Sequence, residues 1–215
     1  MIPTLRELWV FFEAEIFPVH GGDGLFNPYC DFDARFEIES GPQMRRENLR
    51  SYFENFDSAP RILILGEAYG PWGGRFSGIP FTGEAPLSQG ELPFRGVTTS
   101  RSAKPYRERT GDVFWGELAL HAREFFVWNT LPFHPFHKDD PLSIRSPSRA
   151  EISASLYWLQ IIIEILGPEK CLAIGRVAET ALKEIGVNVT YIRHPSRGGI
   201  GKFREGMRSA FIDDL

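Results

Sequence analysis

Residues 61–70 read Arg-Ile-Leu-Ile-Leu-Gly-Glu-Ala-Tyr-Gly, a short apolar run followed by a glycine-containing loop. An unbroken apolar run of this length is typical of a strand that is buried on both faces of a parallel sheet. Residues 188–193 form a second such run, and His194-Pro195-Ser196 follow it. Loops at the carboxyl ends of parallel strands share one edge, where ligands bind. The two loops therefore predict one site built from distant parts of the chain.

Strand and helix patterns alternate along the rest of the chain. Thr4 with Glu7, and Ser148 with Glu151, have the spacing of N-terminal capping boxes. Apolar runs predict strands at 61–65, 125–128, 170–174 and 188–193, and helical periodicity predicts helices at 4–17, 45–56, 112–123, 148–166, 176–185 and 200–211. We therefore expect an α/β fold with three layers, α/β/α, around a central four-stranded parallel sheet.

The length and composition are those of one globular domain. The chain has 215 residues, of which 42% are hydrophobic and 24% are charged, which is enough for a substantial core. Because no internal repeat or linker is visible, we expect a single domain over residues 1–215, with residues 1–60 as an N-terminal helical extension packed on it. The net charge of −4 gives no general attraction to nucleic acid, so any polyanion site must be a local basic patch.

Targeting and cofactor signals are sparse. The N-terminus lacks the features of a signal peptide, and no apolar stretch approaches the length of a membrane span. We therefore expect a cytoplasmic protein without membrane contacts, and a monomer by default. Cys30 and Cys171 are too few to ligate an iron–sulfur cluster by themselves. His134 and His137 resemble a metal cluster only superficially, so we expect neither a metal nor a cofactor.

Two long stretches between the predicted elements are rich in turn-forming residues. Residues 66–109 contain many glycines, prolines and serines, and residues 130–147 are rich in proline and histidine. Loops of this length in a compact domain are usually functional, so we expect surface segments near the site. The basic residues at the end of the first stretch could contact phosphates or form a solvated loop. They are Arg95, Arg101, Lys104, Arg107 and Arg109.

Asn129 directly follows the apolar run at 125–128, where the predicted strand leaves the core. Its amide offers a donor and an acceptor side by side, and this pair can read the edge of a nucleobase or of another planar imide. The alternative is a turn residue whose side chain bonds its own backbone. The spacing alone leaves both interpretations open.

The loop after residues 188–193 offers groups for an anionic ligand. His194 precedes Pro195, which favours an extended backbone, and it could donate to a developing anion or simply anchor the loop. Ser196, Gly198 and Gly199 then lead into the helix predicted at 200–211. The start of that helix could hold a phosphate on its backbone N–H groups.

Phe81 follows Pro80 and lies between two nearby glycines, Gly78 and Gly83. Glycines allow a close approach of backbone, and a fixed aromatic face can stack on a flat base. The alternative is a core phenylalanine flanked by turn glycines. The sequence predicts a base platform only if other segments also point to a nucleic-acid ligand.

Taken together, these segments resemble the uracil-DNA glycosylase superfamily, with five matching parts in the family's order. Residues 66–70 are similar to the Gly-Glu-Ala-Pro-Gly first motif of the family 4 type, and residues 79–83 to the stretch that follows it. Residues 128–130 resemble the family's strand-end asparagine segment, and 173–175 its third strand. Residues 194–196, His-Pro-Ser, resemble the second motif. The resemblance covers most of the chain, about 61–212.

The resemblance implies a monofunctional DNA glycosylase that removes uracil or a related deaminated base in base excision repair. Its partner would be DNA containing a damaged base, and the base would be flipped out of the helix because its glycosidic carbon is inaccessible in the stack. Phe81 would stack on the flipped base, Asn129 would read its Watson–Crick edge, and His194 would stabilise negative charge at its O2. The implied catalytic residues are His194, Asn129 and Glu67, the base-binding residues are Gly66, Ala68, Tyr69, Phe81 and Asn129, and the DNA-phosphate contacts are Ser196, Arg197, Gly198 and Lys202.

The chain departs from the family pattern at two positions of the first motif. Ala68 stands where the uracil-specific branch has an aspartate that positions water, and Tyr69 stands where proline is expected. The candidates for a substitute carboxylate are Glu67, Glu84 and Asp112. The alternative to an active glycosylase is therefore a catalytically weak or inactive member that binds DNA or nucleotides. An unrelated α/β hydrolase would need a Gly-x-Ser-x-Gly nucleophile elbow, which the chain lacks.

Overall fold

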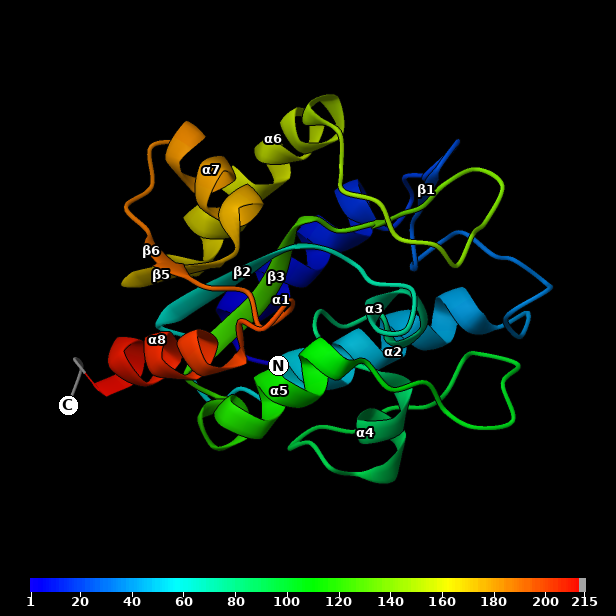
Figure 1. Ribbon diagram of the computed structural model, residues 1–215, viewed down its shortest axis with the longest axis horizontal. Coiled ribbons are helices and arrows are strands. Elements are labelled where there is room, and N and C mark those ends of the chain that lie inside the picture. The colour runs from blue at the N-terminus through cyan, green and yellow to red at the C-terminus, as the bar shows by residue number, and fades with distance from the viewer. Residues whose placement is uncertain (213–215) are drawn as a thin grey trace.

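The centre of the computed structural model, which describes residues 1–212, is a four-stranded parallel sheet of order β3-β2-β5-β6 (Figure 1). Ile62 of β2 lies opposite Phe125 of β3 on one side and Lys170 of β5 on the other. The strands are β2 (Ile62–Ala68), β3 (Phe125–Leu131), β5 (Lys170–Ile174) and β6 (Thr190–Ile192). The predicted four-stranded parallel sheet is therefore confirmed.

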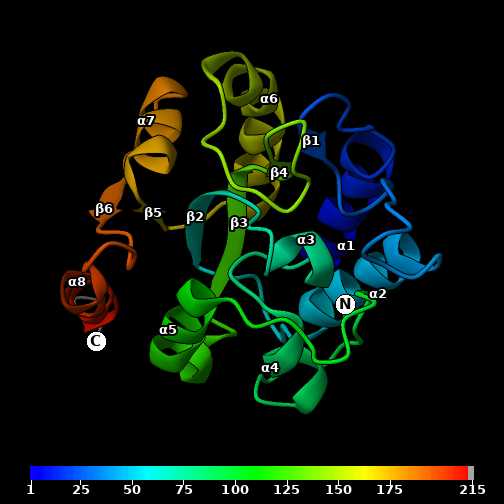
Figure 2. The same cartoon turned by 45° about the vertical axis from the view of Figure 1, so that its right-hand side comes forward.

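Helices cover both faces of this sheet and complete the three layers (Figures 1 and 2). Two helices lie above the sheet in the view of Figure 1, α6 (Arg149–Leu166) and α7 (Arg176–Glu184). Two more lie below it, α5 (Arg109–Leu118), which a short 3-10 turn extends through Ala119–His121, and α8 (Ile200–Ile212). The α/β/α architecture expected from the alternation of patterns is confirmed.

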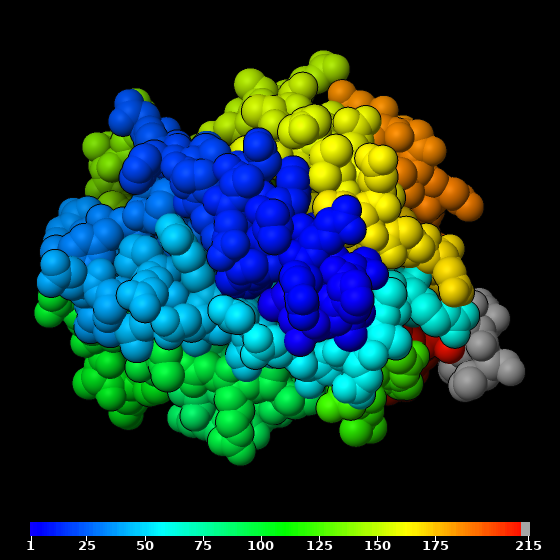
Figure 3. Space-filling view, turned by 180° about the vertical axis from the view of Figure 1, so that it is seen from behind, coloured from blue at the N-terminus to red at the C-terminus, as the bar shows by residue number. Residues whose placement is uncertain are grey.

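The N-terminal residues pack on the β3 side of the molecule, and Figure 3 shows them beside α6 on the rear face. These elements are α1 (Pro3–Phe11), the π-helical turn at Phe12–Ile16 and α2 (Gly41–Glu54). Phe12 lies 4.5 Å from Trp128 between ring centroids, and Phe53 lies 5.2 Å from Phe126. The many phenylalanines therefore form an aromatic layer that joins these helices to β3.

The capping signals had different outcomes. Ser148 and Glu151 form the predicted box at the start of α6, since Ser148 Oγ accepts the Glu151 N–H and the Glu151 carboxylate accepts the Ser148 N–H. The box predicted for Thr4 and Glu7 is wrong. Helix α1 begins one residue earlier, at Pro3, because proline fixes a helical φ and needs no N–H partner at the first position.

The prediction that residues 66–109 form a long surface loop is wrong for much of this stretch. It contains two short helices, α3 (Gly74–Ser77) and α4 (Glu84–Gln89), and residues 73–87 are buried. Apolar side chains such as Phe76 and Leu87 anchor it in the core. A composition rich in glycine and proline predicts irregular backbone, but it does not predict whether that backbone is buried or exposed.

The histidine- and proline-rich stretch after β3 also contains structure that the sequence did not predict. β4 (His134–Pro135) pairs antiparallel with β1 (Leu25–Phe26). These pairs are two residues long, too short to show a periodic pattern. In the part of the chain that the structure describes, no helix combines the length and the apolar character needed to cross a membrane.

Candidate active site

A cavity of about 540 Å³ opens at the carboxyl ends of the parallel strands. Strand β2 brings Glu67 and Ala68 to it, β3 brings Asn129, and the segment after β6 brings His194. Distant parts of the sequence meet here because all four strands run in one direction. The predicted site residues that line the cavity are Glu67, Ala68, Tyr69, Phe81, Asn129, His194, Ser196 and Arg197.

Three predicted site residues do not line this cavity. Gly66 lies behind its wall, within β2. Gly198 borders a neighbouring cavity at the start of α8. Lys202 is exposed on α8 and borders neither of the two. Contacts of Gly198 and Lys202 with phosphates stay predictions about nucleic acid that extends beyond the cavity.

Asn129 lies inside a strand rather than at its end. The prediction that this strand ends at 128 is wrong, because β3 continues to Leu131 and pairs Asn129 with Gly66 of β2, which itself continues to Ala68. Asn129 is only 3% exposed. Its side chain lines the cavity. A turn-forming role is therefore excluded, and the amide is available to a ligand.

The missing side chain of Gly66 lets two groups meet in the cavity wall. A Cβ built on Gly66 would lie 2.4 Å from Asn129 Oδ1 and 2.7 Å from the Phe81 ring. Atoms do not approach so closely without a bond between them, so both neighbours occupy space that any larger residue would need. Glycine at this position therefore brings a hydrogen-bonding amide and an aromatic ring to one place.

Several contacts fix the Phe81 ring beside this amide. One face of the ring stacks on Phe114, with 4.8 Å between centroids and 10° between planes. The next residue, Thr82, is held by hydrogen bonds to Pro80 O and from Trp115 Nε1, both 2.9 Å. These contacts hold the Phe81 backbone at φ 53°, where a non-glycine residue is strained by about 1–3 kcal/mol. The ring is thus pre-positioned at the cavity.

The hydrogen bonds of His194 define which of its nitrogens carries a proton. The Ser196 N–H donates to His194 Nδ1 at 3.1 Å, so Nδ1 is an acceptor. The Ser196 hydroxyl lies 2.8 Å from the same nitrogen. Burial of the ring, with a smaller contribution from the charge of Arg193, lowers the pKa of His194. Above that pKa the imidazole is neutral and protonated at Nε2, which makes Nε2 a hydrogen-bond donor.

Ser196, which was predicted to contact a phosphate, is hydrogen-bonded to His194. With Nδ1 as an acceptor, the Ser196 hydroxyl donates to it and has no second proton for a phosphate oxygen. The following residues, Arg197 and Gly198, have φ values of 51° and 74° and turn the chain toward α8. Ser196 and Arg197 both border this cavity and the one at the start of α8. The phosphate contacts predicted for the two residues therefore differ in the chemistry of their side chains and not in their position.

Glu67 and Tyr69 take different positions on either side of Ala68. Burial raises the pKa of Glu67, and a hydrogen bond with Ser146 offsets part of that increase. The Tyr69 side chain instead lies in the core, where its hydroxyl is 2.6 Å from that of Tyr29. Tyr69 can therefore offer only its backbone to the cavity, and Ala68 offers no functional group beside it.

Two of the carboxylates considered as substitutes are engaged elsewhere. Glu84 is buried and accepts hydrogen bonds from the backbone N–H groups of Thr99 and Ser100, at 2.6 and 2.9 Å. Asp112 pairs with Arg107 at 2.8 Å. Neither carboxylate lines the main cavity. Glu84 stabilises the buried part of residues 66–109, and Asp112 belongs to the surface of α5.

Glu108 lines the cavity and was missed in the sequence. It directly precedes α5 and lies among the basic residues between Arg95 and Arg109. Burial, with a further contribution from the negative charge of Asp112, raises the pKa of Glu108 to about 7. No local sequence pattern could reveal this environment, because it is created by contacts with Gly70 and Gly73 in the first loop.

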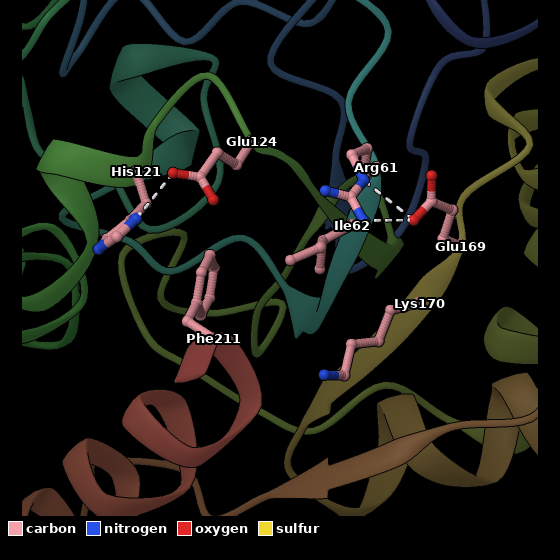
Figure 4. A pocket seen from close by; sticks show the side chains of 7 residues that line it. All are labelled: Arg61, Ile62, His121, Glu124, Glu169, Lys170 and Phe211. Carbon is pink, nitrogen blue, oxygen red and sulfur yellow. Dashed lines mark hydrogen bonds and ion pairs between the residues drawn. The ribbon is translucent and has the colours of Figure 1, made fainter. Parts of the chain in front are cut away.

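A second cavity, of about 500 Å³, lies at the opposite edge of the sheet (Figure 4). Its walls include Ile62 and Lys170, the first residues of β2 and β5. Arg61 pairs with Glu169 there at 2.7 Å. Because ligand sites of parallel sheets form at the carboxyl edge, we place the functional site at the first cavity and not here.

One group with metal-ligating atoms occurs among residues 1–212, and the sequence did not predict it. His20, Cys30 and Asp31 place their ligand atoms within 4.8 Å of one another. Internal hydrogen bonds account for the arrangement, since Asp31 bonds His20 at 2.7 Å and accepts the N–H groups of Gly21 and Asn27. This group does not border the main cavity.

The fold and the cavity define a parallel-sheet α/β protein whose site suits a flat ligand with hydrogen-bonding edges. The family model of the uracil DNA glycosylase superfamily matches residues 53–215. The chain therefore belongs to the uracil DNA glycosylase superfamily, as its motifs indicated. No curated protein matches it by sequence.

The fold is also similar to a solved structure, that of wild-type SMUG2 from Pedobacter heparinus. The TM-score is 0.67 at 16% sequence identity, and the match covers 99% of this chain and 98% of that one. Such a low identity shows a shared fold and no more. Because the match covers nearly the whole chain, the N-terminal helices, nearly all of which lie before the family match, belong to the shared fold.

Proposed function

We propose that this protein is a monofunctional DNA glycosylase that hydrolyses the N-glycosidic bond of uracil or a related deaminated base flipped out of DNA. Membership of the superfamily supports a glycosylase-type function. The observation that carries the proposal is the meeting of the Asn129 amide and the Phe81 ring over Gly66 in one cavity. A ring that stacks on a base and an amide that reads its edge are the groups that recognise a flipped base.

His194 has the chemistry that the leaving base requires. When the bond from the sugar carbon to the base breaks, the base departs with the electron pair, and negative charge develops on its ring and oxygen atoms. A neutral imidazole with a proton on Nε2 can donate a hydrogen bond to that charge. Ser196 holds the ring in this state through Nδ1. His194 therefore stabilises the leaving group.

The rim of the cavity supports binding of a polyanion despite the negative charge of the whole chain. Four arginines line it: Arg145, Arg176, Arg193 and Arg197. Arg145 and Arg176 pair with glutamates, whereas Arg193 donates to the carbonyl oxygens of His194 and Ser196 and stiffens the loop. A local basic rim is sufficient for phosphate contacts, which fix the register of DNA on a protein.

An excision assay tests the proposal directly. Labelled oligonucleotides carry uracil, hypoxanthine, xanthine or 5-hydroxymethyluracil, as single strands and opposite each partner base, and alkali-labile abasic product is measured. We expect product from at least one of these bases, and we expect Asn129→Ala and His194→Ala each to abolish it. The matched surface variants Asn188→Ala and His137→Ala should keep wild-type rates, because both residues are exposed away from the cavity.

Ala68 keeps a second function open, that of a catalytically weak member that binds DNA or nucleotides. A methyl group at this position cannot activate water or offset positive charge on the sugar. This alternative predicts salt-sensitive DNA binding without abasic product from any of the oligonucleotides. Loss of both binding and excision would contradict both functions.

A further inference from the structure

Glu108 has a conformation that its position at a helix start does not explain. It is the N-cap residue of α5, yet its side chain makes no capping hydrogen bond to that helix. The carboxylate instead turns to the loop after β2. A Cβ built on Gly73 would lie 1.9 Å from Glu108 Oε2, and one built on Gly70 would lie 3.3 Å from Oε1. The glycines of this loop therefore leave space that the carboxylate occupies.

The carboxylate of Glu108 is unpartnered among the described residues. Oε2 is sealed from solvent and has no hydrogen-bond partner in residues 1–212. The neighbouring cation Arg107 does not neutralise Glu108, because it pairs with Glu91 and Asp112. A buried carboxylate without a partner is destabilising. Ionisable side chains in such unfavourable environments cluster at active sites. Glu108 borders the same cavity as Asn129 and His194.

We infer that Glu108 is the general base that activates the attacking water, a task that Ala68 cannot perform. This inference rests on the glycosylase reaction proposed above. The carboxylate reaches the cavity from the segment before α5, beside the first-motif loop rather than from within it. Glu67, the other carboxylate of the cavity, lies in β2 next to Ser146. The two carboxylates approach the cavity from different elements.

The reaction step balances with water as its only co-reactant. The bond between C1′ and the base nitrogen breaks, and its electron pair leaves with the base, which His194 stabilises as an anion. A water oxygen forms a new bond to C1′, and the proton it loses passes to the Glu108 carboxylate. Solvent then takes this proton, and the departing base is protonated by water. No oxidant, reductant or metal enters the step.

The charges around Glu108 set the pH range in which it can accept a proton. Burial raises the pKa of Glu108 to about 7, with the negative charge of Asp112 on α5 as the smaller cause. The other charged or titratable groups that line the cavity are Glu67, Tyr69, Arg145, Arg176, Tyr191, Arg193, His194 and Arg197. A base with a pKa near 7 combines a useful ionised fraction with a real affinity for the proton.

The test compares Glu108→Gln with the wild-type protein on a substrate that the wild type excises. We expect the single-turnover rate to fall by about 10²–10⁴-fold, while DNA affinity, measured by fluorescence anisotropy, stays within about twofold. The matched surface variant Glu47→Gln should keep the wild-type rate, since that residue is exposed, outside the cavity and away from the ion pairs of Arg107. Formate should restore part of the rate to Glu108→Ala, because it supplies a carboxylate in the space that alanine leaves.

The pH dependence separates a base from a merely structural residue. The wild-type rate should rise with pH and level off above about 7, and Asp112→Asn should move this midpoint to lower pH by removing a negative charge. Two results would overturn the inference, even if other variants misfold. One is a pH–rate midpoint that does not move in Asp112→Asn, and the other is a Glu108→Gln rate equal to that of the wild type. A wild-type protein that excises no base overturns the proposed function itself, which is a distinct result.

Discussion

Gly66 and Asn129 lie opposite each other in the β2–β3 ladder, and a Cβ on Gly66 would come within 2.4 Å of Asn129 Oδ1. The φ of Gly66 is not positive, so its backbone conformation is open to alanine. The Asn129 amide and the Phe81 ring are what alanine would displace. Side-chain clearance, and not backbone freedom, is therefore the reason for glycine at this position.

Gly66→Ala should lower the excision rate by about 10²-fold, the usual effect of displacing a reacting group by about 1 Å. Stability should also fall, by about 1–3 kcal/mol, because the new Cβ overpacks two buried side chains, so the rate is compared per folded molecule. Gly116→Ala is the matched control, since a Cβ there meets nothing within 4 Å. Full activity in Gly66→Ala would mean that Asn129 and Phe81 do not need their present positions.

Phe81→Leu should weaken productive base binding by about 1–3 kcal/mol, or about 5- to 150-fold, because leucine fills space but offers no aromatic face. The measured quantity is kcat/KM on the excised base. Phe203→Leu is the control, because Phe203 is buried near Phe114 and outside the cavity. It should lower stability without changing the rate per folded molecule. Equal kinetics in the two variants would remove Phe81 from base recognition.

Glu37 is a buried carboxylate between two buried arginines. It contacts Arg45 and lies 3.4 Å from Arg75, and all three side chains are inaccessible to solvent. Glu37→Gln should lower the free energy of unfolding by about 3–5 kcal/mol, because it leaves two cations without their carboxylate. Urea titration at pH 7 measures this change. Glu54→Gln, which removes the exposed partner of Arg50, should cost no more than about 1 kcal/mol.

The sequence predicted the elements whose signals are local. The apolar run at 62–65 and the capping box at Ser148 both appear where expected, because each depends on residues close together in the chain. The strand ends were wrong, since Gly66 and Asn129 continue a ladder that depends on their pairing across the sheet. Buried backbone around residues 73–87 was also missed. Burial depends on what covers a segment, which composition does not record.

The candidate site shows the same limit. Asn129 and His194 stand directly after apolar runs, so sheet geometry alone predicted that they would meet. Glu108 has no such signal, because its environment is created by the glycines at 70 and 73 and by the fold of the segment between them. The hydrogen bonds of Ser196 to His194 were not predicted either, since they follow from the turn and not from the motif.

Glu108 should make the stability of the protein depend on pH. Its pKa rises from 4.5 in the unfolded chain to about 7 in the folded protein, so the folded state holds the proton more tightly. Stability from this group is present below about pH 4.5 and is lost as pH rises through about 7. Relative to Glu108→Gln, the wild type should lose up to about 3 kcal/mol between pH 5 and 8. Urea titrations of both proteins across this range measure the difference, and parallel curves would contradict the raised pKa.

Ser196 and Arg197 should respond differently to mutation because the Ser196 hydroxyl is bonded to His194, whereas the Arg197 side chain carries a positive charge that can contact a phosphate. Ser196→Ala removes one hydrogen bond to Nδ1 but keeps the backbone N–H bond at 3.1 Å. The excision rate should therefore fall by only about threefold to tenfold, with no change in the salt dependence of DNA binding.

Arg197→Ala should change the salt dependence of DNA binding and leave the excision rate nearly unchanged. Loss of one phosphate contact lowers the slope of log affinity against log salt by about 1, while the rate at saturating DNA stays near the wild type. Both slopes come from fluorescence anisotropy titrations at several salt concentrations. If Ser196→Ala changed the salt slope and Arg197→Ala did not, the phosphate contact would lie at Ser196, and the Ser196 hydroxyl would have to turn away from His194 when DNA binds.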